Sequence, residues 1–159
     1  MVTLEILILM LQTIIPKDIS VVEIDRSEQL TLCLFLLQEC GMNKEENIAI
    51  ASTLVNTATI KKITIKQCLN ERTSHWMNYK RVLSRLKERS RTDILKKYEY
   101  ACVSIKNTNK YTHYLRDHEK PQWRKRVKWI KKIGSHTFGT AYWTGIRWIR
   151  SNRRSHGNT

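Results

Sequence analysis

TSHWMNYKRVLSRLKERS, residues 73–90, combines five Lys or Arg residues with apolar residues at helical spacing. At about 100° per residue, one group of its side chains lies within about 60° of Tyr79 on a helical wheel, namely Val82, Leu83 and Leu86. This face predicts a helix over residues 75–89 that packs on a core. The opposite arc carries Met77, Lys80, Arg81, Ser84, Arg85 and Glu88. The helix is therefore either a solvated surface helix or one that lies against phosphates and base edges.

Three further helices are predicted ahead of this stretch. SEQLTLCLFLLQECG, residues 27–41, has Ser27 as a candidate N-cap and Gly41 as a candidate stop. NKEENIAIASTLVNTA resembles a capping box followed by apolar residues at helical spacing, which predicts a helix over 43–59. KKITIKQCLNE predicts a short helix over 64–71, with a strand left open as the alternative because its start is β-branched.

The N-terminal segment VTLEILILMLQTII is apolar on nearly every side. It lacks a basic flank and a small-residue cleavage pattern, and it is too short to span a bilayer. A buried helix or a dimer-forming element is therefore favoured over a membrane anchor. IPKDISVVEID, residues 15–25, is interpreted as a turn with a short extended piece.

The pattern changes after residue 90. YEYACVSI, residues 98–105, and KYTHYL, residues 110–115, are rich in strand-forming residues and flank KNTN, which predicts a β-hairpin. Its expected basic tip consists of Lys106, Asn107, Asn109 and Lys110. PQWRKRVKWIKKIG, residues 121–134, is interpreted as a helix with Pro121 in its first turn and with Trp123, Val127 and Ile130 on one side.

Charge is the outstanding property of the composition. The chain of 159 residues has 29 Lys and Arg residues against 14 Asp and Glu residues, a formal net charge of +15. Residues 1–60 hold three basic and eight acidic residues, whereas residues 61–159 hold 26 basic and six acidic ones. This imbalance indicates a polyanionic partner, and it predicts packing or self-association for the first part.

The order of the predicted elements resembles a winged helix-turn-helix over residues 43–117. The resemblance rests on that order and on ITIKQCLNERTSHWMNYKRVLSRLKE, not on a diagnostic string. Two features depart from the pattern: the turn RTSH has no Gly, and RTDILKKY makes a long connection to the first expected strand. The expected fold class is mainly α with a small β-hairpin. The expected parts are an N-terminal packing or dimerisation segment (1–42), the winged domain (43–117) and a basic, Trp-rich extension (118–159).

The resemblance implies a sequence-specific regulator that binds duplex DNA, with helix 75–89 in the major groove. It places Ser74, His75, Asn78 and Arg81 at base edges, Lys80, Arg85 and Lys87 at phosphates, and Lys106, Asn107 and Lys110 at the wing tip. In the extension, Arg124, Lys125 and Arg126 are expected to face DNA phosphates. The protein is accordingly expected to be cytoplasmic and associated with the nucleoid. It is expected to form a dimer through its N-terminal segment and not to bind a membrane.

The extension leaves an alternative open. Trp123, Trp129, Trp143 and Trp148 lie among eleven Lys or Arg residues. Three interpretations of these indoles are open: stacking on unpaired bases of RNA or a single strand, insertion at a membrane interface, or packing of the extension onto the domain. Packing is favoured for most of them. An RNA-binding or ribonucleoprotein role is therefore the alternative function.

Catalysis finds little support in the sequence. The five His residues are scattered, no CxxC or HExxH pair occurs, and no Gly-rich phosphate loop is present. The cluster Asp117-His118-Glu119 is interpreted as a solvated turn. The widely spaced cysteines are interpreted as reduced, buried small residues. The chain is therefore not expected to be an enzyme. It is also not expected to bind a cofactor, a metal or a small-molecule substrate.

Overall fold

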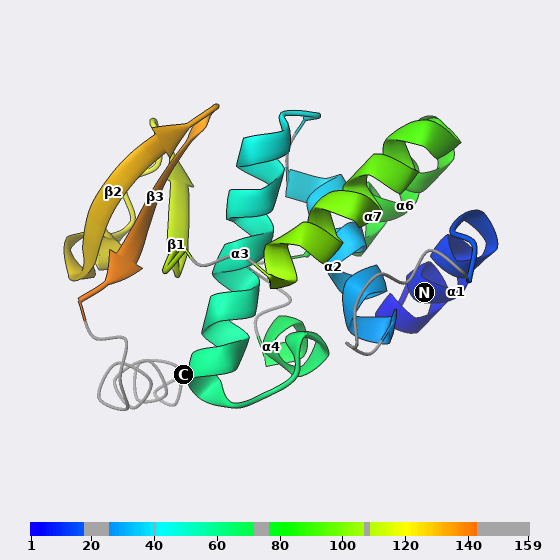
Figure 1. The fold of residues 1–159 in the computed structure, drawn as a ribbon, viewed down its shortest axis with the longest axis horizontal. Helices are drawn as coiled ribbons and strands as arrows, with labels where there is room; N and C mark the ends of the chain where they lie inside the picture. The colour runs from blue at the N-terminus through cyan, green and yellow to red at the C-terminus, as the bar shows by residue number, and fades with distance from the viewer. Residues whose placement is uncertain (18–25, 40, 72–76, 107–108, 143–159) are drawn as a thin grey trace.

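The computed structural model of this chain is mainly helical with a small three-stranded antiparallel sheet, which confirms the expected class at that level (Figure 1). It describes residues 1–17, 26–39, 41–71, 77–106 and 109–142. The helices are α1 (Leu4–Ile14), α2 (Arg26–Glu39), α3 (Lys44–Lys61), α4 (Ile65–Glu71), α6 (Tyr79–Glu88) and α7 (Arg91–Ile105). The strands are β1 (His113–Arg116), β2 (Val127–Ile133) and β3 (His136–Ala141), and the 3-10 helix η1 (Gln122–Arg126) precedes β2.

Helix α2 is the centre of the helical part. Every residue from Gln29 to Gln38 is buried, because α1, α3, α4, α6 and α7 all pack against this helix. The continuous run of leucines suits a helix that is covered on every side. The helix predicted over 27–41 is thereby confirmed. The thiols of Cys33, Cys68 and Cys102 are buried, as expected, and burial raises the pKa of Cys33.

Helices α3 and α4 also form where the sequence predicted them. Asn43 caps α3 by accepting a hydrogen bond from the Glu46 N–H at 2.9 Å. The carboxylate of Glu46 does not complete a capping box, because it bonds to the sheet instead. The reciprocal box occurs at α4, where the side chains of Thr64 and Gln67 each accept from the other's backbone N–H.

The hairpin predicted over residues 98–115 is not formed, because its first strand, residues 98–105, is helical. Residues 91–105 form helix α7, which Ser90 caps by accepting from the Asp93 N–H at 3.2 Å. Ile94, Tyr98 and Ala101 are buried at helical spacing against α2 and α3. The β-branched and aromatic composition suggested a strand, but burial of this one stripe between two helices favours the helix.

The predicted helix over 121–134 is also wrong. Pro121 precedes η1, and β2 begins at Val127. Val127 and Ile133 are buried at the two ends of the strand while Lys residues between them are exposed. A turn at Gly134, which has a φ of 59°, then returns the chain into β3. The hairpin of this protein is thus β2–β3, and β1 adds to its other edge in the order β1-β3-β2.

The two faces of the sheet pack differently. Phe138 and Ile133 join the main core, which runs from Leu4 through the helices. Successive residues of a strand point to opposite faces, and the irregularity between Trp129 and Lys131 changes the alternation, so Val127 and Ile133 face opposite sides. On the other face, Leu115, Val127 and Ala141 are buried outside that main core. The sheet therefore docks on α3 through one face and carries a second, smaller apolar cluster on the other.

Helix α1 is buried on one face only. Leu4, Leu7 and Leu11 pack inward, whereas Ile6 is 44% exposed and Leu9 is 62% exposed. The expectation of burial on nearly every side is therefore not met within one copy of the chain. None of the described helices is both long and apolar enough to cross a membrane. Most of the predicted extended piece, residues 18–25, lies outside the described residues.

Substituting Gly139 tests the close approach of β2 and β3. A Cβ at this position would lie 2.5 Å from the Lys128 carbonyl oxygen and 2.6 Å from Cγ1 of Val127. Gly139→Ala is therefore expected to lower the free energy of unfolding by about 1–3 kcal/mol. Gly41→Ala is the control, since nothing lies within 4 Å of the Cβ it would add. Urea unfolding measures both, and equal stability of the two variants would contradict the close approach.

Candidate nucleic-acid interface

Helix α6 is held against the helical core by its N-terminal end and one face. The Asn78 N–H donates a hydrogen bond to Oε1 of Gln38 at the end of α2. Val82 and Leu86 are buried, and the helix packs on α1 and α2. Met77, which the helical wheel placed on the outer arc, is buried as well, because the helix begins only at Tyr79 and Met77 precedes it.

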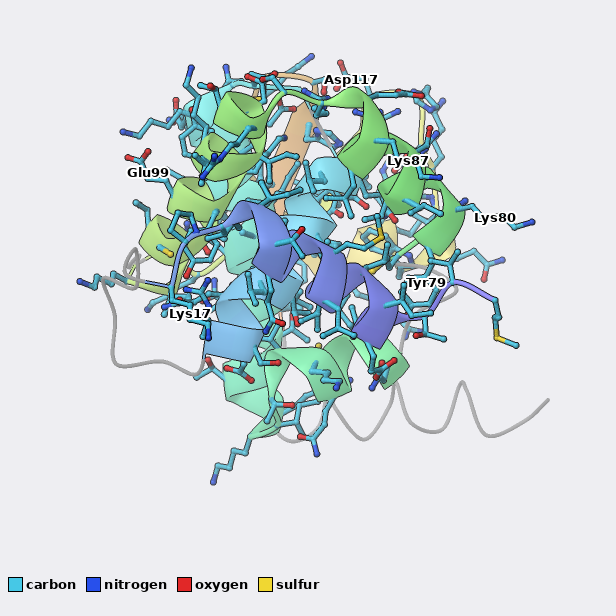
Figure 2. The ribbon with its side chains drawn as sticks, turned by 90° about the vertical axis from the view of Figure 1, so that its right-hand side faces the viewer. Lys17, Tyr79, Lys80, Lys87, Glu99 and Asp117 are labelled. Atoms are coloured by element: carbon cyan, nitrogen blue, oxygen red, sulfur yellow. The ribbon has the colours of Figure 1, made fainter. Side chains whose placement is uncertain are left out.

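The solvent face of α6 is cationic. Lys80, Arg81 and Lys87 are exposed and Arg85 is half-buried. Within the described part of the chain, no carboxylate pairs with any of these four side chains, and Glu88 accepts from Ser84 on its own helix. Lys80 and Lys87 extend from the outer edge of α6 (Figure 2). The structure therefore places the four predicted basic residues of this helix on its outer arc, where Lys80, Arg81 and Lys87 are accessible.

Asn78 does not fit its predicted role as a reader of adenine. It is the N-cap of α6, and its Oδ1 accepts a hydrogen bond from the Arg81 N–H at 3.1 Å. A two-point contact to adenine uses both the oxygen and the nitrogen of the side-chain amide, and the cap occupies the oxygen. The predicted positions Ser74 and His75 lie outside the described residues.

The predicted wing tip is not formed. Lys106 is the C-cap of α7, and Asn107 lies outside the described residues. Lys110 is next to the sheet, where its carbonyl accepts from the Thr140 hydroxyl at 2.6 Å. The sheet and α6 lie at opposite ends of the molecule, with α3 between them (Figure 1). Helix α6, predicted as a recognition helix, and the predicted basic hairpin therefore do not form the adjoining surface that the sequence predicted.

A second basic surface covers η1 and the start of β2. Arg124, Lys125, Arg126 and Lys128 are all exposed, and none has an acidic partner within the described residues. Farther along β2, Lys131 pairs with Glu45 at 2.8 Å and Lys132 pairs with Asp117. Such exposed pairs are weak and screened by salt. Arg124, Lys125 and Arg126 are thus accessible as predicted, but on a 3-10 helix over a sheet and not on an α-helix.

Tryptophans attach η1 to the sheet. The ring of Trp123 lies 5.0 Å from the His113 ring and 6.3 Å from the Trp129 ring, measured between centroids. The Trp129 Nε1–H donates to the Arg124 carbonyl at 3.2 Å. Trp123 remains 38% exposed. These two indoles therefore pack within the sheet region, as favoured from the sequence, while Trp143 and Trp148 lie outside the described residues.

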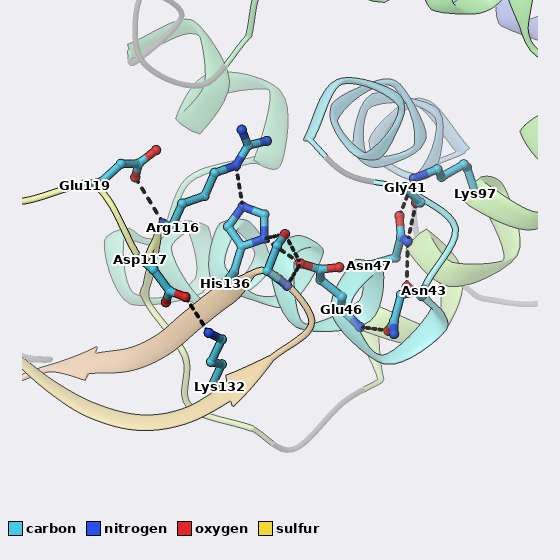
Figure 3. Close-up of polar contacts among 11 residues, drawn as sticks. Gly41, Asn43, Glu46, Asn47, Lys97, Arg116, Asp117, Glu119, Lys132 and His136 are labelled. Carbon is cyan, nitrogen blue, oxygen red and sulfur yellow. Dashed lines mark hydrogen bonds and ion pairs between the residues drawn. The ribbon is translucent and has the colours of Figure 1, made fainter.

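A buried polar cluster joins the sheet to the first turn of α3 (Figure 3). Glu46 is 5% exposed and His136 is 2% exposed. Oε1 of Glu46 accepts from the Ser135 N–H at 2.9 Å and the Ser135 hydroxyl at 2.8 Å, and it lies 2.6 Å from Nδ1 of His136. On the other side of the ring, Nε2 of His136 accepts from Nε of Arg116 at 3.4 Å.

This cluster resembles a Ser-His-Glu set in composition but lacks the geometry for catalysis. A catalytic His uses one ring nitrogen for the hydroxyl and the other for the carboxylate. Here Ser135 and Glu46 both lie at Nδ1, and Arg116 occupies Nε2. Burial opposes ionisation of Glu46, but hydrogen bonds from His136 and Ser135 hold its pKa below its ordinary value. We interpret the cluster as the clamp that docks the sheet on α3.

A second buried polar site closes the turn between α2 and α3 (Figure 3). The Nζ of Lys97 on α7 donates to the carbonyls of Leu36 and Gly41 at 3.0 and 2.6 Å, and to Oδ1 of Asn47 at 2.6 Å. Lys97 is fully buried. Cations favour the C-terminal ends of helices, where carbonyls lack intrahelical partners. Sequence reasoning missed both buried sites, because their members are far apart in the chain.

The chain matches no protein-family model, no curated protein and no solved structure. Function therefore has to be inferred from its own residues. Asp117, His118 and Glu119 lie in an exposed turn, and the described residues contain no group of three or more His, Cys, Asp or Glu side chains that could hold a metal. The strongest chemical feature of the described surface is its two sets of unpaired cations, which suit phosphate binding.

Proposed function

We propose that this protein binds duplex DNA through α6 and acts as a sequence-specific transcriptional regulator. The observation that carries the proposal is the row of cations on the solvent face of α6, which has no carboxylate partner among the described residues. Charges of alternating sign along a helix face indicate a solvent-exposed helix held by salt bridges. On α6 the outer face is basic apart from Glu88, which is bonded to Ser84.

The size of α6 also suits the proposal. Ten helical residues span about 15 Å, and the major groove of B-DNA is about 12 Å wide and admits an α-helix. In this arrangement Lys80, Arg85 and Lys87 would contact phosphates, and Arg81 near the start of the helix would face a guanine edge. Because Asn78 is the N-cap of α6, Arg81 would be the main residue of the described helix that contacts a base.

A winged helix-turn-helix remains a proposal for the arrangement around α6. Helices α3, α4 and α6 follow one another in the order that such a domain has. The departure is α7, which stands between α6 and the strands. A homodimer that pairs through the exposed Ile6 and Leu9 side chains of α1 would suit a palindromic target.

Neutralising α6 tests the proposal. The helix variant carries Lys80→Gln, Arg81→Gln and Lys87→Gln. We expect it to bind duplex DNA about tenfold or more weakly. We also expect the slope of log affinity against log salt to fall by about 2, since Lys80 and Lys87 are its two phosphate contacts and each lost contact removes about 0.9. Fluorescence anisotropy of a labelled duplex at several salt concentrations measures both quantities.

A charge-matched variant provides the control for this measurement. It carries Lys17→Gln, Lys44→Gln and Lys96→Gln. These substitutions also remove three positive charges, but from exposed positions outside α6. We expect this control variant to keep most of the affinity and slope of the native protein. If the helix variant and the control variant bind duplex DNA equally well, α6 is not the binding surface and the proposal fails.

RNA binding is the second candidate, and the half-exposed Trp123 beside Arg124 and Lys125 favours it. Aromatic rings among cations are typical of proteins that bind unpaired bases. Selection from a random duplex pool, with a random RNA pool in parallel, separates the two candidates. Enrichment of one duplex sequence supports the regulator, whereas enrichment of structured RNA supports the alternative.

A further inference from the structure

The described surface carries two basic clusters that are far apart. The helix cluster consists of Lys80, Arg81, Arg85 and Lys87 on α6. The sheet cluster consists of Arg124, Lys125, Arg126 and Lys128 on η1 and β2. Figure 1 shows α6 and the sheet at opposite ends of the longest axis, with α3 and then α2 with α7 between them. The two clusters therefore lie on different ends of one packed body.

Hydrogen bonds and side-chain packing hold the two clusters in these positions. The sheet is clamped to α3 by Glu46, which bonds to Ser135 and His136 across the β2–β3 turn. At the other end, α6 is buried against α2 through Val82 and Leu86. Helices α2 and α3 are in turn joined through the buried Lys97. The molecule thus presents two separated cationic surfaces on one packed core.

The chemistry of the sheet cluster suits phosphates better than stacked bases. The Trp123 ring already contacts the rings of His113 and Trp129, and the Trp129 indole is bonded to the Arg124 carbonyl. The four cations of the sheet cluster are exposed and lack acidic partners within the described residues. A backbone of closely spaced phosphates, as in a duplex, matches such a set.

We propose that one molecule bridges two DNA duplexes, holding one at the helix cluster and the other at the sheet cluster. This inference rests on the proposed duplex binding by α6. It adds a second binding site and a bridging activity. A single copy that carries both clusters can bridge two duplexes without forming a dimer. A pair of copies joined through α1 would instead use one cluster from each copy.

A capture assay tests bridging. Short biotinylated duplex is immobilised on beads, protein is added, and the retention of a second, fluorescent duplex is measured at moderate salt. The sheet variant carries Arg124→Gln, Lys125→Gln and Lys128→Gln, and it is compared with the helix variant, the charge-matched control variant and the native chain. Binding of a single duplex by each protein is measured separately by anisotropy, and circular dichroism checks that each variant is folded.

We expect the native chain and the control variant to retain the second duplex. The sheet variant should still bind one duplex through the helix cluster but no second duplex, so it should retain at least about tenfold less of the second duplex, because one phosphate-binding surface is lost. The helix variant should lose retention as well. A mixture of the helix and sheet variants should not restore it, because neither molecule then carries both surfaces.

Three outcomes would overturn the inference. If the sheet variant retains the second duplex fully, a pair of copies and not two ends of one copy makes the bridge. If the sheet variant loses single-duplex binding altogether, the helix cluster does not hold a duplex by itself, and one molecule does not bridge two duplexes. If the native chain binds one duplex but never retains a second, bridging does not occur. Failure of the proposed function is recognised separately, since the helix variant would then bind a single duplex as well as the control variant does.

Discussion

Lys97→Met is expected to lower the free energy of unfolding by about 2–5 kcal/mol, since each buried acceptor that loses its partner costs about 1–3 kcal/mol. The native Nζ is fully buried and donates to the carbonyls of Leu36 and Gly41 and to the Asn47 side chain. Met fills a similar volume but donates no hydrogen bond. The Gly41 carbonyl keeps one donor in the variant, the Asn47 Nδ2–H, so most of the cost falls on the other two acceptors.

Lys96→Met is the matched control for this prediction. Lys96 is the preceding residue of α7, and its side chain is exposed. The same substitution there removes one positive charge without opening a buried site, so we expect little change in stability. Urea unfolding followed by circular dichroism at 222 nm, a helix band, gives both values. Equal midpoints for the two variants would mean that Lys97 does not hold the turn between α2 and α3.

Glu46→Gln is expected to weaken the docking of the sheet and to remove part of the acid sensitivity of the fold. Charge-assisted hydrogen bonds contribute about 1.5–3 kcal/mol each, so we expect a loss of that order at neutral pH. Hydrogen bonds from His136 and Ser135 outweigh burial and lower the pKa of Glu46 in the folded state. Its ionisation therefore stabilises the fold above the unfolded pKa, and this contribution is lost as pH falls through the lower, folded pKa.

The measurement is the urea midpoint between neutral and strongly acidic pH, followed by Trp fluorescence, to which Trp123 and Trp129 of the sheet region contribute. Glu45→Gln is the matched control, because Glu45 is the neighbouring residue but forms an exposed pair with Lys131. We expect the native chain and the control to lose stability in acid more steeply than Glu46→Gln. Parallel pH profiles for all three proteins would show that the Glu46 clamp does not contribute to docking.

Local patterns predicted four helices of the described structure. The apolar run of α2, the Asn43 cap of α3 and the amphipathic face of α6 each depend on residues within a few turns of one another. Such signals are local, and helix formation responds to them directly. The same reasoning predicted that Cys33 and Cys68 would be buried.

The predictions for α7 and β2 were wrong, because residue composition and residue spacing do not indicate one type of secondary structure there. In α7 the aromatic and β-branched residues indicated a strand, whereas the Ser90 cap and the spacing of Ile94, Tyr98 and Ala101 indicate a helix. In VKWIKKI the interspersed lysines suit either element, and pairing with β3 decided for the strand. Long-range partners supply the free energy that overrides such weak local preferences.

By itself, the sequence determined the predicted helices, the burial of the thiols and the basic excess after residue 60, because each depends on neighbouring residues or on composition. Only the tertiary structure decided which basic residues share a surface. Glu46 meets His136 across 90 positions of the chain, and this contact docks the sheet on α3, away from α6. Contacts over such distances pay a loop-closure entropy that no local pattern records, so they emerge only when the whole core assembles.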